Sequence, residues 1–285
     1  MNICICGASG FIGKSLMLNF KASGCNVSTI TRIDFQRNQL KNKLEDQNIL
    51  INLAGEAINK RWTVRNKRAI YDSRILTTRL LVNATNKLEI PLDLFINISA
   101  VGIYDNTFEH MEDSIHFSDG FLSTVVQDWE APLKEIVSRS TRIVILRLGV
   151  VLDRDGGMLF KIRKPYSWRM GFDFMMDKSF PVIHKKDLMR IIDYIIEKKE
   201  ILGVVNVVGP FRSDIKAFFR GLNRRWKPFV IIPVSEKLLK LLMGESAVLI
   251  TEGQKVIPEV LIKSGFHFEF DTLEKVLDDI CNLNS

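Results

Sequence analysis

The sequence predicts an α/β protein built on a doubly wound parallel sheet, with a smaller lobe towards the C-terminus. Three observations lead to this fold class. Apolar, strand-like runs alternate with segments of helical periodicity along the chain. The first run leads directly into a turn spaced by the glycines Gly7, Gly10 and Gly13. The chain also contains no internal repeat or low-complexity tract, so we expect both lobes to share one compact unit.

Six segments have the composition of buried strands, and helical segments separate them. The strands are predicted at 2–6, 27–31, 49–53, 94–98, 142–148 and 204–208. The helices are predicted at 13–22, 66–86, 124–138, 184–198, 214–223 and 235–243, and a further short strand at 229–234. In such sheets, ligands bind outside the carboxyl ends of the strands, where the strand order reverses. We therefore expect functional residues directly after strands.

Length and composition narrow the class of protein. The chain has 285 residues, of which 46% are hydrophobic and 26% charged, as is typical of a globular protein with a sizeable core. No apolar run reaches the roughly 18 to 20 residues of a membrane span, and the N-terminus lacks a signal-peptide pattern. The cysteines are too scattered for a zinc site and fit a reducing compartment; they are Cys4, Cys6, Cys25 and Cys281. We expect a cytoplasmic protein with no metal and no membrane partner.

The formal net charge of +7 raises the question of a nucleic-acid partner. Basic residues concentrate at 60–68 and at 224–227, on predicted helices or at their ends, where a basic face is usually solvated. No nucleic-acid-binding module surrounds either stretch. We therefore expect a small-molecule substrate and no nucleic acid. The exposed helix faces of such a sheet leave a homodimer open.

The glycine-spaced turn has the form of a dinucleotide-binding fingerprint. Gly7 would permit the tight turn, Gly10 would let the backbone approach a pyrophosphate, and Gly13 would let the next helix pack closely on its strand. Free N–H groups at the start of that helix would face the phosphates. The expected contacts are Gly7, Ser9, Gly10, Phe11, Ile12 and Gly13. The alternative is a turn that merely connects two elements.

Arg32 follows the second predicted strand, at the position where the ribose of a dinucleotide lies. An acidic residue there binds a ribose 2′-hydroxyl, whereas arginine accommodates a 2′-phosphate. The sequence therefore favours NADP over NAD. Two alternatives remain: Arg32 is an ordinary solvated charge, or Asp34 binds the ribose.

Residues after the third and fifth strands complete the expected binding site. The stretch after the third strand contains small residues, which would let the backbone approach the adenosine and its ribose. Its expected contacts are Leu53, Ala54, Gly55 and Glu56. After the fifth strand, Val150 is expected to contact the nicotinamide through its backbone. His184 is a lone histidine at the start of a predicted helix. Such a histidine more often has a structural role than a catalytic one.

The candidate catalytic residues are Ser99 and Tyr104, which follow the fourth strand. A hydroxyl at a strand end and a phenol five residues later could polarise a carbonyl or move a proton beside a nicotinamide. The alternative is structural: Ser99 satisfies local backbone groups, and Tyr104 packs under a loop.

A series of ordered motifs runs nearly from end to end of the chain. They are GASGFIG at 7–13, Thr31-Arg32, INLAGE at 51–56, KRW at 60–62, Asp72-Ser73-Arg74, SAVGIY at 99–104, DWE at 128–130, LRLGVVLDRDGG at 146–157, VIHKKDL at 182–188 and GQKVIPEVL at 253–261. With these motifs the chain resembles the atypical extended short-chain dehydrogenase/reductases that are labelled NAD-dependent epimerase/dehydratase, including cell-division-inhibitor-like members.

The resemblance implies a Rossmann core that binds NADP, formed by residues 1–155 with a strand and a helix from about 183–210. It implies a smaller substrate lobe formed by residues 156–182 and 211–285. It also implies that Thr31, Arg32 and Arg74 lie near the phosphates or the ribose of NADP, with Leu53 and Ala54 beside it.

The chain departs from the wider superfamily at the usual catalytic pair. Ordinary members carry a proton-donating tyrosine and a lysine four residues later, whereas these positions hold Trp129 and Leu133. An indole N–H can donate but cannot titrate usefully, and Lys134, one residue late, would face about 100° away on a helix. Similar family members also carry this tryptophan. A second departure, the bulky stretch 166–176, would line an apolar pocket, form a lid or pack the small lobe.

We therefore expect an NADP-dependent oxidoreductase or epimerase that acts on a small carbonyl or sugar-nucleotide-like substrate. The absent tyrosine and lysine motivate an alternative, a non-catalytic NADP-binding protein that senses redox state or binds a partner. A nucleic-acid or structural adaptor is a third hypothesis.

Overall fold

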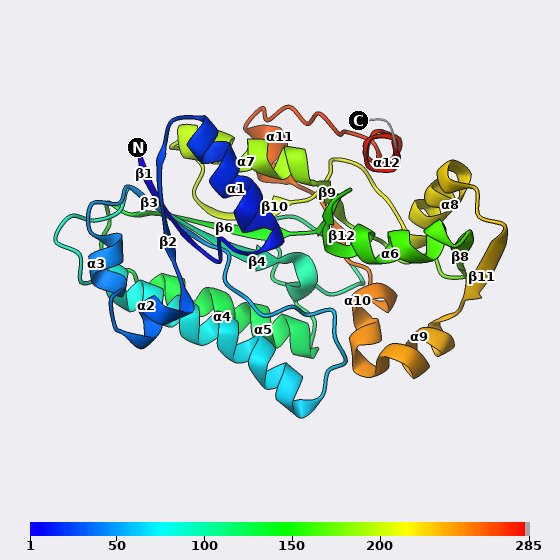
Figure 1. Cartoon of the computed structure of the whole chain (residues 1–285). Coiled ribbons are helices and arrows are strands. Elements are labelled where there is room, and N and C mark those ends of the chain that lie inside the picture. Colours follow the sequence, from blue (N-terminus) through cyan, green and yellow to red (C-terminus); the bar gives the residue numbers. More distant parts are fainter. Residues whose placement is uncertain (283–285) are drawn as a thin grey trace.

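Six apolar strands form a parallel sheet at the centre of the molecule (Figure 1). The computed structural model describes residues 1–282. The strands lie in the order β10-β6-β4-β3-β1-β2, which confirms the predicted doubly wound α/β fold. Their bounds are β1 (Asn2–Cys6), β2 (Asn26–Ile30), β3 (Ile49–Asn52), β4 (Leu94–Ala100), β6 (Arg142–Leu148) and β10 (Gly203–Val207).

Helices cover both faces of this sheet, because successive side chains of a strand point to opposite faces. On β1, Ile3 and Ile5 pack with residues of the helices on one face, whereas Cys4 and Cys6 pack with residues of those on the other. The first face is covered by α1 (Phe11–Ala22), α7 (Lys185–Glu197) and α11 (Glu259–Lys263). The second is covered by α3 (Leu40–Leu44), α4 (Val64–Thr85), η2 (Ala131–Glu135) and, in Figure 1, α2 (Arg32–Gln36) and α5 (Phe121–Glu130).

The helix predicted at 124–138 is wrong in its ends. The α-helix α5 begins three residues earlier, at Phe121, ends at Glu130, and continues as the 3-10 helix η2. Pro132 explains the change, since it lacks the N–H that an α-helix interior needs. Lys134 therefore does not lie on the α-helix that carries Trp129.

A smaller lobe lies beyond the carboxyl ends of the sheet strands (Figure 1). It contains β7 (Val150–Asp153), α6 (Gly157–Ser167), β8 (Met170–Phe174), β9 (Val182–His184), α8 (Ile215–Trp226), β11 (Val230–Val234), α9 (Glu236–Met243), η3 (Gly244–Ala247), α10 (Val248–Thr251) and α12 (Leu273–Cys281). The bulky stretch 166–176 mainly packs this lobe: Tyr166, Phe174 and Met176 are buried in its core. Phe174 stacks on Phe219, with 4.2 Å between the ring centroids.

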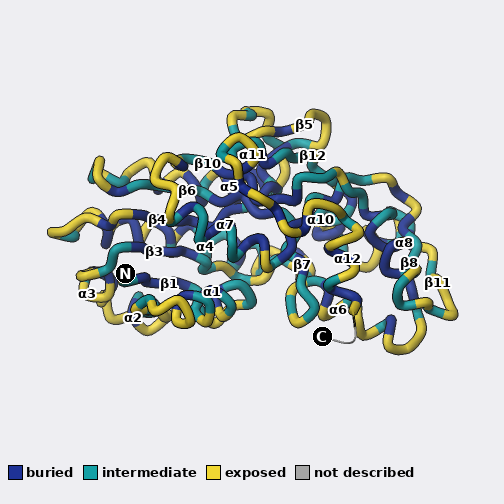
Figure 2. Tube along the Cα trace, turned by 90° about the horizontal axis from the view of Figure 1, so that it is seen from above, coloured by how far each residue is buried: buried dark blue, intermediate teal, exposed yellow. Residues whose placement is uncertain are grey.

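Between α10 and α12 the chain returns from the small lobe to the large sheet. Strand β12 (Lys255–Val256) pairs with β5 (Glu109–His110), which follows the 3-10 helix η1 (Val101–Ile103). Leu261, Phe266 and Phe268 are buried in the same core as β1. Figure 2 shows α11 next to β10 of the large sheet and α12 next to α8 of the small lobe. The segment between β12 and α12 thus packs on the large sheet, while the predicted division into a core and a substrate lobe stays a prediction.

None of the helices within residues 1–282 combines the length and the apolar character that crossing a membrane requires.

His184 joins β9 to α7 and has a structural role. Its Nδ1 accepts a hydrogen bond from the backbone N–H of Lys186 (3.2 Å), and so caps α7. Its Nε2 lies 3.1 Å from a carboxylate oxygen of Asp279, which ties α12 to this junction. Burial lowers the pKa of His184, and the nearby Asp279 carboxylate only partly opposes this effect.

We predict that protonation of His184 destabilises the fold, because a protonated Nδ1 can no longer accept from Lys186. The folded-state pKa lies below the ordinary value of about 6.5, so the unfolded chain binds the proton more readily. The stabilisation is therefore complete above about pH 6.5 and falls as the pH drops through that value. Urea unfolding between pH 7.5 and 5.5 should show a loss of about 1 kcal/mol, the value of a helix cap. The variant His184→Asn can still cap but does not titrate; an unchanged pH dependence in this variant would refute the assignment.

Candidate functional site

Two positions at the turn after β1, Gly7 and Gly13, have no room for any residue other than glycine. Gly7 has a φ of +86°, and a Cβ atom there would lie 2.8 Å from the carbonyl carbon of Leu53. A Cβ atom at Gly13 would lie 2.4 Å from the carbonyl oxygen of Gly7. The N–H of Gly10 donates to that same oxygen (3.1 Å) and closes the turn. The predicted glycine turn thus brings the start of α1 against β1 and the end of β3.

The N-terminus of α1 is suited to an anion. Gly10 is its N-cap residue, so no side chain at that position caps the helix, and its first turn contains no acidic residue. The first N–H groups of a helix have no partner within the helix and carry the positive end of its dipole. Ser9 is exposed beside this terminus, and Phe11 and Ile12 are half-buried in its first turn. These residues fit the pyrophosphate of a dinucleotide.

The turn lies where the strand order reverses, since β1 pairs with β2 on one side and with β3 on the other. The N–H of Leu53 donates to the carbonyl of Cys6 (2.9 Å), so the chain leaves β3 along the turn. The buried Asn52 fixes the next peptide, because its Oδ1 accepts from the N–H of Ala54 (3.2 Å). Its Nδ2 donates to Asn97 of β4 (2.7 Å) and to Thr78 of α4 (3.0 Å).

Sequence reasoning missed the positioning role of Asn52. The available signal was a pair of asparagines, Asn52 and Asn97, inside two largely apolar strands that the fold aligns in register.

Arg32 and Asp34, the two alternatives for the ribose position, have different surroundings. The Arg32 side chain is 94% exposed at the start of α2. The carboxylate of Asp34 is buried, and one of its oxygens accepts from both the N–H and the hydroxyl of Thr31, at 2.7 Å each. Burial raises the pKa of Asp34, but these bonds and Lys43 outweigh it and hold the pKa below its usual range. Asp34 is thus engaged within its own turn, which leaves Arg32 as the exposed group.

Glu56 is held by α4 and flanked by two cations. Its N–H donates to the hydroxyl of Ser73 (2.9 Å), and its carbonyl accepts from Arg74 (3.0 Å). Its carboxylate lies 2.8 Å from Lys60 and 3.9 Å from Arg32. The bond with Lys60 is the main reason that the pKa of Glu56 lies below its usual range.

Arg74 positions the loop after β3. Its guanidinium donates to the carbonyls of Glu56 and Ile70, lies against Gly55, and stacks 5.1 Å from the ring of Trp129. Burial lowers the pKa of Arg74 to about 10. These contacts explain how the Asp72-Ser73-Arg74 motif serves the site: two of its side chains fix the backbone at Glu56. Contact between Arg74 and a phosphate or ribose stays a prediction.

Ser99 and Tyr104, the predicted catalytic residues, lie within a buried network. The hydroxyl of Ser99 donates to Glu130 (2.6 Å), whose carboxylate pairs with Arg147 (2.7 Å). Arg147 also donates to the hydroxyl of Tyr104 (2.8 Å), which in turn donates to Asn206 (2.9 Å). Ser99 is 2% exposed and Tyr104 is fully buried.

This network weighs against direct proton transfer by Ser99 or Tyr104. Both hydroxyls are already engaged inside the protein, and burial raises the pKa of Tyr104. The half-buried neighbour at the strand end, Ala100, carries no polar side chain. A structural role is thereby favoured for both residues, although Ser99 bonds the distant Glu130 and not the local backbone groups that the alternative named. Their catalytic role stays a prediction.

The positions of the usual tyrosine and lysine also have structural contacts. The indole N–H of Trp129 donates to the hydroxyl of Thr78 (3.0 Å), and Leu133 is buried against the sheet. Trp129 therefore links α5 to α4 and orients its indole N–H towards that helix.

The predicted nicotinamide end lies where β7 follows β6. Val150 pairs with Val182 in β9, and its N–H donates to the carbonyl of Pro181 (2.8 Å). The next loop packs on the dinucleotide turn: a Cβ atom at Gly156 would lie 2.2 Å from the Phe11 ring. Lys185 lies above the same ring, 5.1 Å from its centroid, and pairs with Asp153. The small lobe thus contacts the turn through Phe11, and contact of Val150 with a nicotinamide stays a prediction.

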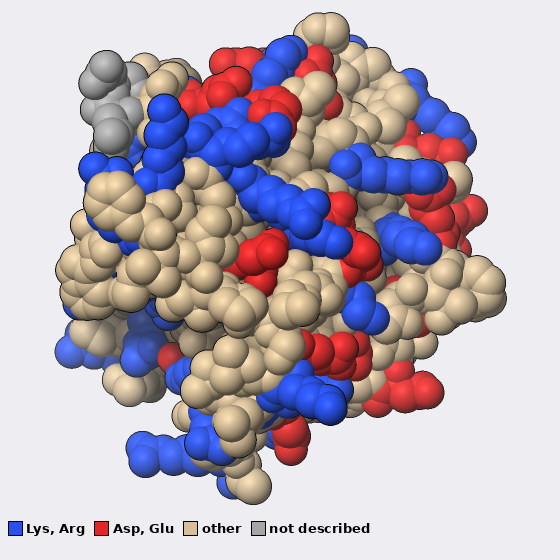
Figure 3. All heavy atoms as spheres, turned by 90° about the vertical axis from the view of Figure 1, so that its right-hand side faces the viewer, with Lys and Arg blue, Asp and Glu red and all other residues tan. Residues whose placement is uncertain are grey.

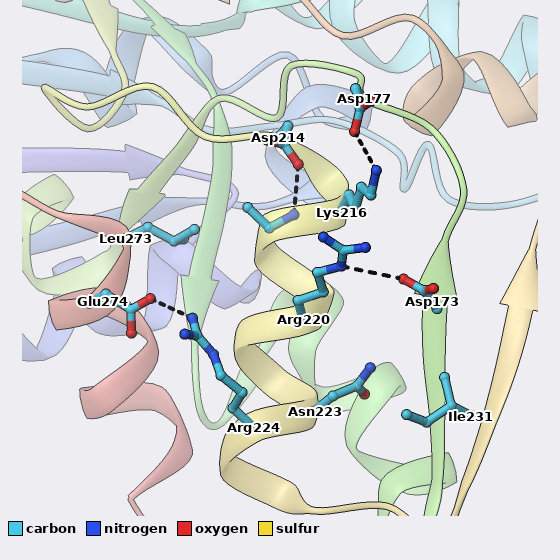
Figure 4. A pocket seen from close by; sticks show the side chains of 11 residues that line it. Asp173, Asp177, Asp214, Lys216, Arg220, Asn223, Arg224, Ile231, Leu273 and Glu274 are labelled. Atoms are coloured by element: carbon cyan, nitrogen blue, oxygen red, sulfur yellow. Dashed lines mark hydrogen bonds and ion pairs between the residues drawn. The ribbon is translucent and has the colours of Figure 1, made fainter.

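A groove of about 720 Å³ on the outer side of α8 is not this site (Figure 4). Its cations Lys216, Arg220 and Arg224 each lie within ion-pair distance of a carboxylate. The groove includes none of the residues of the glycine turn or of the Glu56 loop. Basic and acidic side chains are intermixed across this end of the molecule (Figure 3), so it presents no field of one sign.

Comparisons with known proteins agree with this geometry. Residues 3–119 match the model of the NAD dependent epimerase/dehydratase family, and residues 234–280 match a domain of unknown function, DUF1731. The mouse epimerase family protein SDR39U1 is 30% identical over 98% of this chain and 99% of its own length. The Bacillus subtilis epimerase family protein YfhF is 31% identical, with 98% of each chain covered.

Solved structures show the same fold. The human epimerase family protein SDR39U1 (isoform 2), determined with NADPH, has a TM-score of 0.90 at 29% identity and covers 99% of this chain and 100% of its own. A dTDP-4-dehydrorhamnose reductase from Bacillus anthracis, in complex with NADP, has a TM-score of 0.80 at 14% identity with 97% of each chain covered, a likeness of fold alone. With its glycine turn, its strand order and these relatives, the chain belongs to the NAD dependent epimerase/dehydratase family.

Proposed function

We propose that this protein binds NADP(H) and acts as an oxidoreductase or epimerase on a small carbonyl or sugar-nucleotide-like compound. The observation that carries the proposal is the glycine turn, which lies against Leu53 and Ala54 and leaves the N-terminus of α1 without a side-chain cap. A solved relative, human SDR39U1, carries NADPH, which supports the choice of dinucleotide.

The chain's own residues would hold the dinucleotide in three places. The turn and the first N–H groups of α1 bind the pyrophosphate. Leu53, Ala54 and Gly55 present backbone to the adenosine ribose, and the exposed Arg32 pairs with a 2′-phosphate. When bound, the nicotinamide supplies or accepts a hydride at a substrate carbon.

Proton transfer would have to proceed without a titrating tyrosine. Trp129 cannot exchange a proton, and the hydroxyls of Ser99 and Tyr104 are engaged with Glu130 and Asn206. We therefore infer that these residues position β4 and β6, and that the proton comes from water or from the substrate itself.

The same engagement favours a second candidate function, a non-catalytic NADP(H)-binding protein that senses redox state or binds a partner. Such a protein needs the dinucleotide frame but no free acid or base. Our proposal also retains a cytoplasmic location, in line with four free cysteines, and leaves a homodimer open.

We predict that Arg32 sets the preference for NADPH. The variant Arg32→Ala should weaken NADPH binding at least tenfold and leave NADH binding nearly unchanged, since a charge-assisted bond to phosphate is lost. Equilibrium fluorescence titration of the nicotinamide measures both affinities. Arg37→Ala, which removes an arginine from the end of the same short helix, is the control and should not alter the ratio. Failure of the wild-type protein to bind any dinucleotide would contradict the proposal.

Turnover separates the two candidate functions. Purified protein is mixed with NADPH or NADP and a panel of small aldehydes, ketones and nucleotide sugars. The nicotinamide absorbance reports net reduction, and chromatography of the nucleotide sugars reports epimerisation, which leaves no net change in the dinucleotide. Enzymatic function predicts one of these two signals with at least one compound, still present in Ser99→Ala if that hydroxyl only positions β4. Tight NADPH binding without turnover over the whole panel would instead support the non-catalytic function.

A further inference from the structure

The carboxylate of Glu56 occupies the space between two cations beside the ribose position. One oxygen lies 2.8 Å from the Lys60 ammonium, and the other lies 3.9 Å from the Arg32 guanidinium. Arg32 is the first residue of α2, just after β2, and Lys60 lies in the loop after β3. Two cations from different parts of the chain are thus gathered around one carboxylate.

Side chains of α4 hold the backbone of Glu56, the residue that carries this carboxylate. Ser73 accepts from the N–H of Glu56, and Arg74 donates to its carbonyl, so α4 fixes both sides of the residue. In the surface pair of Lys41 and Glu45, also four residues apart and 3.4 Å from each other, the N–H of Glu45 bonds to the carbonyl of Lys41 itself and not to another element. Exposed pairs of that kind contribute little to stability. The arrangement around Glu56 is therefore more than an incidental contact.

The two positive charges of Arg32 and Lys60 are balanced better by a phosphate than by the single carboxylate of Glu56. Arg32, Lys60 and Glu56 together leave one net positive charge. A phosphate monoester carries about −1.5 to −2 charges at pH 7 and three acceptor oxygens, whereas a carboxylate carries one charge and two oxygens. Arg32 and Lys60 are both long, flexible side chains; the Arg32 side chain is 94% exposed, and the Lys60 side chain is 33% exposed. Both can therefore turn from Glu56 to a phosphate without any change in the backbone.

We propose that Lys60 is the second cation of the 2′-phosphate site, and that Glu56 is its resident counter-ion. Without a dinucleotide, Glu56 holds Arg32 and Lys60 at the ribose position. The 2′-phosphate takes over both cations, and Glu56 remains nearby as a negative charge that reduces the affinity. The inference rests on the proposed NADP(H) binding and specifies which side chains select the phosphate.

The test compares NADPH and NADH affinities of full-length variants by fluorescence titration. Lys60→Met should weaken NADPH binding about tenfold, the value of one charge-assisted bond, and leave NADH within twofold. Lys60→Arg should restore the preference for NADPH. Glu56→Gln should strengthen NADPH binding about threefold because it removes the repelling charge. Lys41→Met breaks the comparable pair with Glu45 and should change neither affinity.

Each outcome decides the proposal. Equal losses of NADPH and NADH affinity in Lys60→Met, or no loss in either, would overturn the assignment, as would weaker NADPH binding in Glu56→Gln. Thermal unfolding of every variant identifies any loss of fold, and the ratio of the two affinities is insensitive to a uniform loss of active protein. If the wild type prefers NADPH and Lys60→Met keeps that preference, only this inference fails. If the wild type binds no dinucleotide, the proposed function fails first.

Discussion

The backbone of the glycine turn and the backbone at the end of β3 approach each other so closely that no methyl group fits between them at Gly7. This contact brings the carboxyl ends of β1 and β3 together at the point where the strand order reverses. It fixes where α1 begins, and through Leu53 it fixes the path of the loop that carries Glu56 and Lys60. Arg32, Glu56 and Lys60 meet because β2 and β3 flank the same strand.

A second constraint lies deeper in the sheet. The ion pair between Arg147 and Glu130 is buried and connects Ser99 to Tyr104. Loss of one partner of such a pair leaves an uncompensated charge, at a cost of about 3–5 kcal/mol. The network thus holds β4, α5, β6 and β10 in one arrangement next to the predicted nicotinamide end. Trp129 occupies the position expected for the catalytic tyrosine, yet the neighbouring interior of this chain is polar, and we interpret this polar network as a frame for the binding site.

The structural features that depend on short stretches of sequence could be predicted. Six strands, the glycine turn and the arginine after β2 are local signals, and the structure places them as expected. The surroundings of Ser99 and Tyr104 could not be predicted in this way. Their partners Glu130 and Asn206 lie 31 and 102 residues further along the chain, and only the folded sheet brings them together. The same holds for Glu56, whose backbone partners are 17 and 18 residues away.

The central claim is that the turn between β1 and α1 is an NADP(H) site. A crystal structure of the protein with NADPH tests this claim most directly. Our account predicts density for the pyrophosphate at the N-terminus of α1, and for the 2′-phosphate next to Arg32. Density for the dinucleotide elsewhere, for example in the groove on α8, or none at a saturating concentration, would contradict it.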